Sequence, residues 1–260
     1  MVPERVNILG VGVSAINMDM AIETIDQWII KRQRNYVCIT GVHGIIESQS
    51  DQRFQQIHNQ AGLVTPDGMP LVWVSRLRNY RHVQRVYGPD LMSEVCCKSV
   101  SKGHCHFLYG GAPGVPERLA EQLRERFPGI RIVGTYSPTF RNVTLEKDAE
   151  AVRRINDSKA DIVWIGLSTP KQEYWMAAHL GQLNAPVMLG VGAAFDFLVG
   201  IKKQAPRWMQ RSGLEWFYRL VTEPRRLWRR YLTIVPLFAF HIAMDALGLR
   251  NRKRDVIDSA

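Results

Sequence analysis

Up to about residue 195, short apolar runs rich in Val, Ile and Tyr alternate with longer amphipathic stretches. Such alternation is typical of βαβ units, which build a parallel sheet covered by helices. Helices are expected between the strands, including residues 19–31, where Asp19 can cap the first turn, and residues 116–127. The sequence therefore predicts an α/β protein with a Rossmann-like, mainly parallel sheet flanked by helices. The expected strands cover residues 6–9, 36–40, 62–65, 104–109, 131–136, 162–165 and 187–189.

The last sixty residues differ from the rest of the chain in charge. Residues 201–260 carry 13 of the 34 Lys and Arg but only 5 of the 24 Asp and Glu. Their near-apolar run, residues 232–249, contains Pro236, His241 and Asp245 and is too polar to cross a bilayer. We therefore expect a sheet domain at residues 1–200 and, at 201–260, a basic, aromatic, helical appendage that associates with an anionic membrane surface. A core-packing helix with a solvated basic face is the alternative. Nucleic acid is not expected, because aliphatic residues follow the basic ones.

The cysteines and the N-terminus indicate the compartment. The four cysteines have neither C-x-x-C spacing nor the density of a disulfide-stabilised domain. The first residues lack the basic segment and long apolar stretch of a secretory signal. We therefore expect reduced thiols and a cytoplasmic protein, peripheral on the inner face of the cell membrane.

Five of the predicted strands end in loops rich in Gly or Pro. In an open parallel sheet such loops lie at the carboxyl edge, where ligands bind. A cleft for a nucleotide or phosphate is therefore expected, with Gly10, Gly12, Gly110, Gly111 and Gly192 as candidates for binding a phosphorylated donor. Gly10-x-Gly12 also resembles a dinucleotide fingerprint. However, the second strand does not end in the acidic residue that would hold a ribose, so a glycine turn leading into a helix is favoured over an NAD site.

Two acidic residues are candidates for chemistry in this cleft. Asp67 lies between Pro66 and Gly68 at the end of a predicted strand, where it can act as a general base or cap the helix expected at residues 68–76. For Asp196 a cap or a buried salt bridge is favoured over catalysis.

Metal and cofactor chemistry has little support in the sequence. Asp-x-Asp, His-Glu-x-x-His and a Cys/His cluster are absent, and His104-x-His106 has no evident third ligand. We expect neither a metal nor a cofactor. Backbone dipoles and arginines would then have to stabilise the charge of a phosphorylated donor.

The appendage contains three suitable arginines. Arg219, Arg226 and Arg229 are separated by seven and three residues, so they would share one side of a continuous helix. Pro224 can break that helix after the first of them. Neighbouring Trp, Tyr and Phe residues suit the depth of lipid headgroups, and arginine attracts anionic phosphate.

Five sequence blocks occur in order along the chain. They read TPDGMPLV at 65–72, GPDL at 88–91, G-x-x-x-PKQE at 166–173, GVGA-x-FD-x-x-x-G at 190–200, and AP-x-W followed by GLEW-x-x-RL-x-x-EP-x-R at 205–226. With these blocks the chain from about residue 5 to 231 resembles the WecG/TagA/CpsF glycosyltransferase family.

The resemblance implies an inverting, metal-independent transferase that moves a sugar from a UDP donor to a polyprenyl-diphosphate-linked saccharide in cell-surface polymer synthesis. It also implies homo-oligomers and an appendage that moves when the membrane is met. The functional residues that it implies are a base at Asp67, an active-site threonine at Thr40, donor-cleft residues at Gln172 and Asp196, and acceptor-diphosphate arginines at Arg219, Arg226 and Arg229.

One departure from the family concerns the donor sugar. Better-known members carry an asparagine two positions after the threonine, where this chain has Val42 followed by His43. The donor can therefore be of the N-acetylmannosamine type or a related hexose or uronic acid, as in exopolysaccharide synthesis. The alternative functions are a non-catalytic, nucleotide-sensing module at the membrane surface and an NAD-dependent oxidoreductase.

Overall fold

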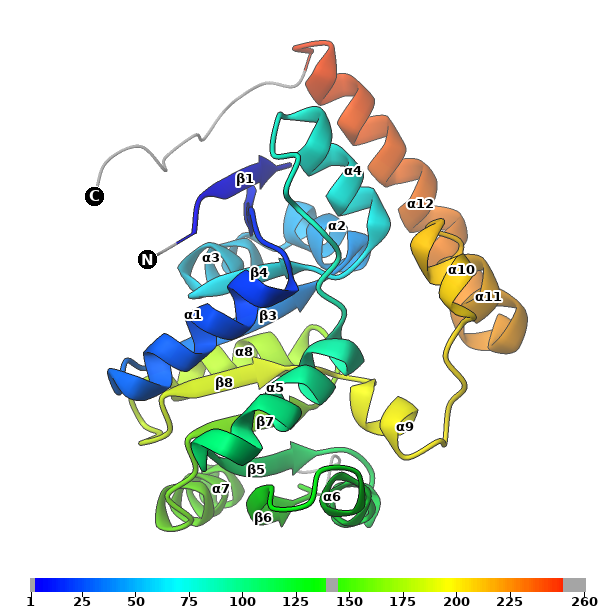
Figure 1. Cartoon of the computed structure of the whole chain (residues 1–260). Coiled ribbons are helices and arrows are strands. Elements are labelled where there is room, and N and C mark those ends of the chain that lie inside the picture. Colours follow the sequence, from blue (N-terminus) through cyan, green and yellow to red (C-terminus); the bar gives the residue numbers. More distant parts are fainter. Residues whose placement is uncertain (1–2, 139–144, 250–260) are drawn as a thin grey trace.

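A six-stranded parallel sheet forms the centre of the molecule, in the order β4-β3-β8-β7-β5-β6 (Figure 1). The structure is a computed structural model that describes residues 3–138 and 145–249, with only the backbone of residues 145–148. It confirms the predicted α/β class and Rossmann-like sheet. The six strands are β3 (Asn35–Thr40), β4 (Leu63–Pro66), β5 (Cys105–Gly110), β6 (Arg131–Tyr136), β7 (Ile162–Gly166) and β8 (Val187–Gly190).

The first predicted strand does not join this sheet. β1 (Arg5–Ile8) pairs antiparallel with β2 (Val11–Ser14) in a separate hairpin. Gly10 lies in the turn at a φ of +87°, which favours glycine, and its N–H donates to the Asn7 side chain at 2.8 Å. The expectation that Gly10 and Gly12 form a strand-to-helix turn is therefore wrong.

Helices cover both faces of the sheet because successive strand residues point to opposite sides. On β7, Val163 and Ile165 pack into one core cluster, whereas Ile162 and Trp164 pack into the other. The first cluster includes residues of α2 (Val42–Ser50), α3 (Gln52–Gln60), α4 (Met69–Leu77), α7 (Leu145–Asp157) and α8 (Lys171–His179). The second includes residues of α1 (Met18–Ile30), α5 (Gly88–Lys102), α6 (Val115–Arg126) and α9 (Ala194–Leu198).

Two helix starts differ from the sequence prediction. The N-cap of α1 is Asn17, whose side chain accepts from the Met20 N–H at 3.0 Å, and Asp19 lies inside the first turn. The N-cap of α4 is Gly68, which provides no side-chain hydrogen bond. The side chain of Asp67 is thereby left free of the capping role considered above.

The end of the chain forms three helices, α10 (Arg207–Arg211), α11 (Glu215–Thr222) and α12 (Pro224–Ala246), which lie along one side of the molecule (Figure 1). Pro224 begins α12, as its predicted helix-breaking role requires. Phe238 of α12 packs into the first core cluster, and Arg78 after α4 forms an ion pair with Asp245. Among the described residues, no helix is long and apolar enough to span a membrane. Residues 250–260 of the predicted appendage lie outside the described part.

Candidate active site

A cavity of about 380 Å³ lies at the carboxyl ends of β4, β3, β8 and β7, which are neighbours in the sheet. Its floor consists of the loops that follow these strands, and α11 and α12 contribute its cover. This is the edge at which open parallel sheets bind ligands. The floor is lined by residues 40–44, 67–70, 168–169, 172–173 and 190–194, and the cover by Glu215, Trp216, Arg219, Arg226, Arg230, Tyr231, Ile234, Val235 and Phe238.

Asp67 follows β4 and lines the cavity. Its Oδ1 accepts from the N–H of Gly88 at 3.3 Å, in the first turn of α5, so the carboxylate lies at that helix N-terminus. A Cβ atom on Gly41 would lie 3.9 Å from Oδ2, which places this oxygen beside the loop after β3. One carboxylate oxygen is therefore anchored, and the other lies next to the cavity-lining glycine loop.

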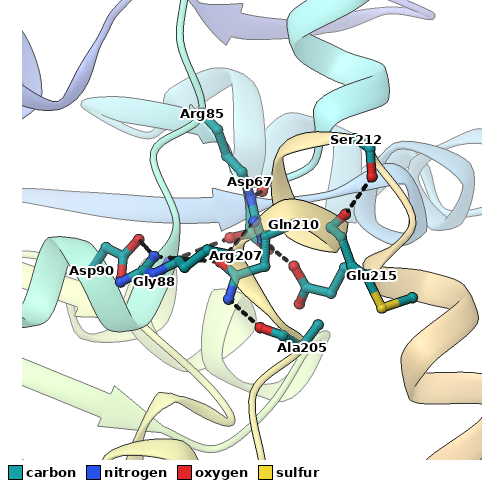
Figure 2. A network of polar contacts seen from close by, with 10 residues as sticks. Asp67, Arg85, Gly88, Asp90, Ala205, Arg207, Gln210, Ser212 and Glu215 are labelled. Carbon is teal, nitrogen blue, oxygen red and sulfur yellow. Dashed lines mark hydrogen bonds and ion pairs between the residues drawn. The ribbon is translucent and has the colours of Figure 1, made fainter.

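Arg85 lies beside Asp67 but does not form an ion pair with its carboxylate (Figure 2). Its Nε donates to the backbone carbonyl of Asp67, and its Nη2 pairs with Glu215 of α11. Its Nη1 donates to Gln210 at 3.3 Å, and its guanidinium lies 4.1 Å from the centre of the Tyr87 ring. Because the guanidinium is engaged by these groups, the Asp67 carboxylate remains available to a substrate proton.

The surroundings of Asp67 make it a stronger base than an exposed aspartate. Burial and, to a smaller extent, the charge of Glu215 raise the pKa of Asp67 to about 6, although Arg85, the Gly88 N–H and Arg219 oppose this rise. At neutral pH the carboxylate is still ionised. A general base with a pKa near the working pH is the most effective kind.

Thr40, at the end of β3, is held by a buried histidine. His58 Nδ1 lies 3.0 Å from the Phe54 carbonyl, which only accepts, so Nδ1 must carry the proton. Burial lowers the pKa of His58 to about 4, and the neutral ring then accepts at Nε2. The Thr40 hydroxyl, 2.9 Å away, donates to Nε2 and keeps its own lone pairs for another donor. Thr40 therefore contributes an oriented hydrogen-bond acceptor to the cavity.

Gln172 and Gly192 also line the cavity, as the donor-binding prediction requires of them. The amide of Gln172 donates to the Gly190 carbonyl at 3.0 Å. A Cβ atom on Gly190 would lie only 3.0 Å from that amide nitrogen. Glycine at this position therefore leaves room for the Gln172 amide. Asp196 does not line the cavity. It forms an ion pair at 2.8 Å with Lys202, which does line the cavity. Of the alternatives considered for Asp196, a salt bridge is the one found, and it is half-buried.

The appendage contributes arginines to the cover. Arg219 of α11 and Arg226 of α12 line the cavity. Arg229 is exposed, lies 5.1 Å from the centre of the Trp228 ring and is not part of the lining. Its neighbour Arg230 lines the cavity instead, and burial, together with repulsion from Arg219 and Arg226, lowers the Arg230 pKa. The structure therefore brings Arg219 and Arg226 to the cavity together with Arg230, whereas Arg229 lies outside it; the acceptor role of these arginines stays a prediction.

Comparison with known proteins identifies the family of this chain. The glycosyl transferase WecG/TagA/CpsF family matches residues 6–252. The chain belongs to this family. Proteins from Staphylococcus aureus strains NCTC 8325 / PS 47, COL and MSSA476, each named N-acetylglucosaminyldiphosphoundecaprenol N-acetyl-beta-D-mannosaminyltransferase, are 30% identical over 252 residues. The match covers 96% of this chain and 96% of each relative.

Four of the predicted donor-binding glycines lie away from the cavity of this glycosyltransferase. Gly10 and Gly12 belong to the hairpin, so the dinucleotide fingerprint is wrong for them. Gly110 and Gly111 follow β5, and the Gly111 N–H donates to the Gly166 carbonyl at 3.0 Å. A Cβ atom on Gly110 would lie 2.8 Å from the Gly166 backbone, so these glycines permit close packing of the two strand ends and do not line the site.

Several lining residues of the glycosyltransferase were not among the sequence candidates. Glu173 and Glu215 stand inside two of the five sequence blocks, so their position in a motif was an available signal. His58 and Arg85 carry no local signal, because only the packing of α3 and of the segment before α5 brings them to the site. In the part of the chain that the structure describes, no three His, Cys, Asp or Glu side chains could together hold a metal ion. Metal independence stays a prediction.

Proposed function

We propose that this glycosyltransferase moves a sugar from a UDP-sugar to a polyprenyl-diphosphate-linked saccharide, with inversion and without a metal ion. The observation that carries the proposal is Asp67, a carboxylate of raised pKa in a cavity covered by arginines. The names of the Staphylococcus aureus relatives describe transfer of N-acetylmannosamine to a diphosphoundecaprenol-linked sugar, which supports the class of acceptor. The nucleotide of the donor is inferred from the family resemblance and the form of the cleft.

Asp67 is the proposed general base in a single displacement. Its Oδ2 takes the proton of the acceptor hydroxyl while that oxygen bonds to the anomeric carbon of the donor. The bond between this carbon and the UDP oxygen breaks, and its electron pair leaves with UDP. One displacement inverts the anomeric configuration, so an α-linked donor yields a β-linked product.

The floor and the cover supply different binding groups. Thr40, Gln172 and Gly192 are the proposed donor-binding residues of the floor, and the N–H groups at the start of α2 suit the phosphates of the leaving UDP. Arg219, Arg226 and, in place of Arg229, Arg230 are proposed for the acceptor diphosphate. Cations placed where negative charge gathers can stabilise it without a metal ion.

The outer surface of α11 and α12 is proposed to lie on an anionic membrane, where the acceptor lipid is found. Exposed apolar residues stand beside exposed arginines on these helices, among them Phe217, Trp228, Leu232 and Phe240. Amphipathic helices of this composition bind at the interface without spanning the bilayer. Association of the protein into homo-oligomers stays a prediction.

The donor sugar is proposed to be of the N-acetylmannosamine type or a related hexose or uronic acid. Val42 and His43 line the cavity close to Thr40, where the better-known members have a different loop. Burial and the nearby Arg230 lower the pKa of His43 to about 4, so its ring is uncharged at neutral pH. An uncharged ring can donate and accept one hydrogen bond each toward sugar hydroxyls.

The proposal is tested by a screen of UDP-sugars against a short-chain polyprenyl-diphosphate-linked N-acetylglucosamine. We expect UDP release that depends on the acceptor and persists in EDTA, with a β-linked product identified by NMR. Without release from any UDP-sugar, the proposed donor class is wrong. A product with retained configuration contradicts the single displacement, and loss of activity in EDTA that Mg²⁺ restores contradicts metal independence.

A further inference from the structure

Two polar side chains of α8 are buried at the floor of the cavity. Gln172 is 2% exposed and Glu173 is 1% exposed. The Gln172 Nε2 uses both of its hydrogens, one toward the Gly190 carbonyl at 3.0 Å and one toward Glu173 Oε1 at 3.1 Å. The Thr169 hydroxyl donates to the same Glu173 oxygen at 2.9 Å. Glu173 therefore fixes the orientation of the Gln172 amide.

These hydrogen bonds leave two oxygens unused. Gln172 Oε1 and Glu173 Oε2 are buried and have no hydrogen-bond partner among residues 3–138 and 145–249. A Cβ atom on Gly192 would lie 3.3 Å from Gln172 Oε1, so this oxygen lies against the glycine turn that follows β8. Because both residues line the cavity, a ligand there can provide the missing partners.

The floor around Glu173 differs in charge from the cover. In the described part of the chain, Glu173 forms no ion pair; burial and, to a smaller extent, the charge of Glu173 raise the pKa of the Cys38 thiol on β3. Burial raises the pKa of Glu173 to about 7, and the hydrogen bonds from its own backbone, Thr169 and Gln172 only oppose this rise. A substantial fraction of the carboxyl group is therefore uncharged at neutral pH. An uncharged ligand group fits this end of the cavity, whereas phosphates fit the arginines.

We propose that Glu173 is a donor-selecting residue, which holds Gln172 and, together with it, binds an uncharged hydroxyl- or N–H-bearing ring of the nucleotide sugar. The inference rests on the proposed function for the identity of the donor. The ring is either the transferred sugar or the nucleoside, since both present the same hydrogen-bonding groups. In either position the donor diphosphate extends away from Glu173, toward the N–H groups at the start of α2.

The experiment compares Glu173→Gln and Glu173→Met by calorimetric titration with UDP and with UDP-N-acetylmannosamine. Glutamine keeps an acceptor for Thr169 and Gln172 and places an N–H₂ group where Oε2 stands, so we expect it to bind within about threefold of wild type. Methionine has similar length but no strong hydrogen-bonding group, and a lost ligand hydrogen bond weakens binding about tenfold. Loss for the UDP-sugar alone places the sugar at Glu173, and equal loss for both ligands places the nucleoside there.

Lys171→Met is the matched control, because Lys171 is exposed on the same helix and does not line the cavity. Thermal unfolding of each variant checks the fold, and Thr169→Val, which removes one donor to Glu173, replaces the methionine variant if that does not fold. Wild-type affinity for both ligands in Glu173→Met, or equal losses in the Gln and Met variants, overturns the role of Glu173 alone. Failure of the wild-type protein to bind either ligand overturns the proposed donor as well.

Discussion

The floor and the cover of the active-site cavity are held in place by different forces. The floor consists of loops anchored to four neighbouring parallel strands, and its polar groups are fixed by hydrogen bonds such as that between Thr40 and His58. In the cover, α11 contains no buried residue and α12 contains only Leu227 and Phe238. The fold thus gives the floor a rigid support and leaves the cover weakly attached. Local stability of this kind follows the number of buried apolar contacts.

The largest effect, a loss of turnover, is expected from a substitution in the floor that leaves the shape of the floor intact. Asp67→Asn keeps the oxygen that accepts from the Gly88 N–H but cannot take a proton at neutral pH. Because a positioned base contributes roughly 10²- to 10⁴-fold, turnover should fall by about that factor. Initial rates of UDP release measure the loss, and an unchanged melting temperature shows that the fold is kept. Near-wild-type turnover would reduce Asp67 to a structural partner of α5.

The next largest effect is expected where the cover is attached. Phe238→Ala removes the ring that α12 places in the core cluster, and truncation of a buried Phe costs about 3–5 kcal/mol. Phe240→Ala is the matched control, because Phe240 is 58% exposed and such changes usually stay within about 0.5 kcal/mol. Urea unfolding and hydrogen exchange of α12 measure both variants. Equal destabilisation by the two changes would contradict the attachment of α12 through Phe238.

The same two variants separate attachment from membrane contact. We expect Phe240→Ala to weaken binding to vesicles that contain anionic lipid, since its exposed ring belongs to the proposed membrane-facing surface. Phe238→Ala should affect stability first, because Phe238 faces the core. Vesicle sedimentation distinguishes them, and unchanged binding of the Phe240 variant would argue against this surface.

A smaller effect, on the KM for the acceptor, is expected when an arginine of α12 is replaced, and its size depends on which arginine is changed. Arg230→Ala should raise the acceptor KM about tenfold, the value of one charge-assisted hydrogen bond, whereas Arg229→Ala should leave it nearly unchanged. Kinetics with the diphosphate-linked acceptor at a fixed donor concentration measure the difference, with UDP affinity as the control. A stronger effect of Arg229 than of Arg230 would mean that α12 turns when the acceptor binds.

The sequence predicts the floor better than the cover for a physical reason. A strand end followed by Gly or Pro lies at the carboxyl edge of a parallel sheet, so Asp67 and Gly192 could be placed at this edge from the sequence pattern, whereas Thr40 and Gln172 were implied only by the family resemblance. The prediction failed at Gly10, because a hairpin turn and a strand-to-helix turn use the same glycine spacing. The sequence also did not distinguish Arg229 from Arg230, which lines the cavity, because spacing along a helix does not tell how the helix is rotated on the body.

Contacts between distant segments were the other part that the sequence could not predict. Arg85 reaches Asp67 and Glu215 only after the segment before α5 and the start of α11 meet. No local propensity encodes this meeting, which depends on the packing of the appendage. Floor and cover are therefore linked electrostatically at Asp67, although they differ in how they are held.

The smallest expected effect tests that link through the pH dependence of the reaction. Since the pKa of Asp67 is about 6, kcat/KM should fall about tenfold for each pH unit below that value, as the base becomes protonated. Glu215→Gln removes a negative charge that disfavours ionisation of Asp67 and also frees Arg85, so both consequences lower the Asp67 pKa and move the fall to lower pH. Arg219→Gln removes a positive charge and should move it to higher pH. Shifts of opposite sign, each a fraction of a pH unit, are the expected result; equal shifts or none would show that the cover does not tune the base.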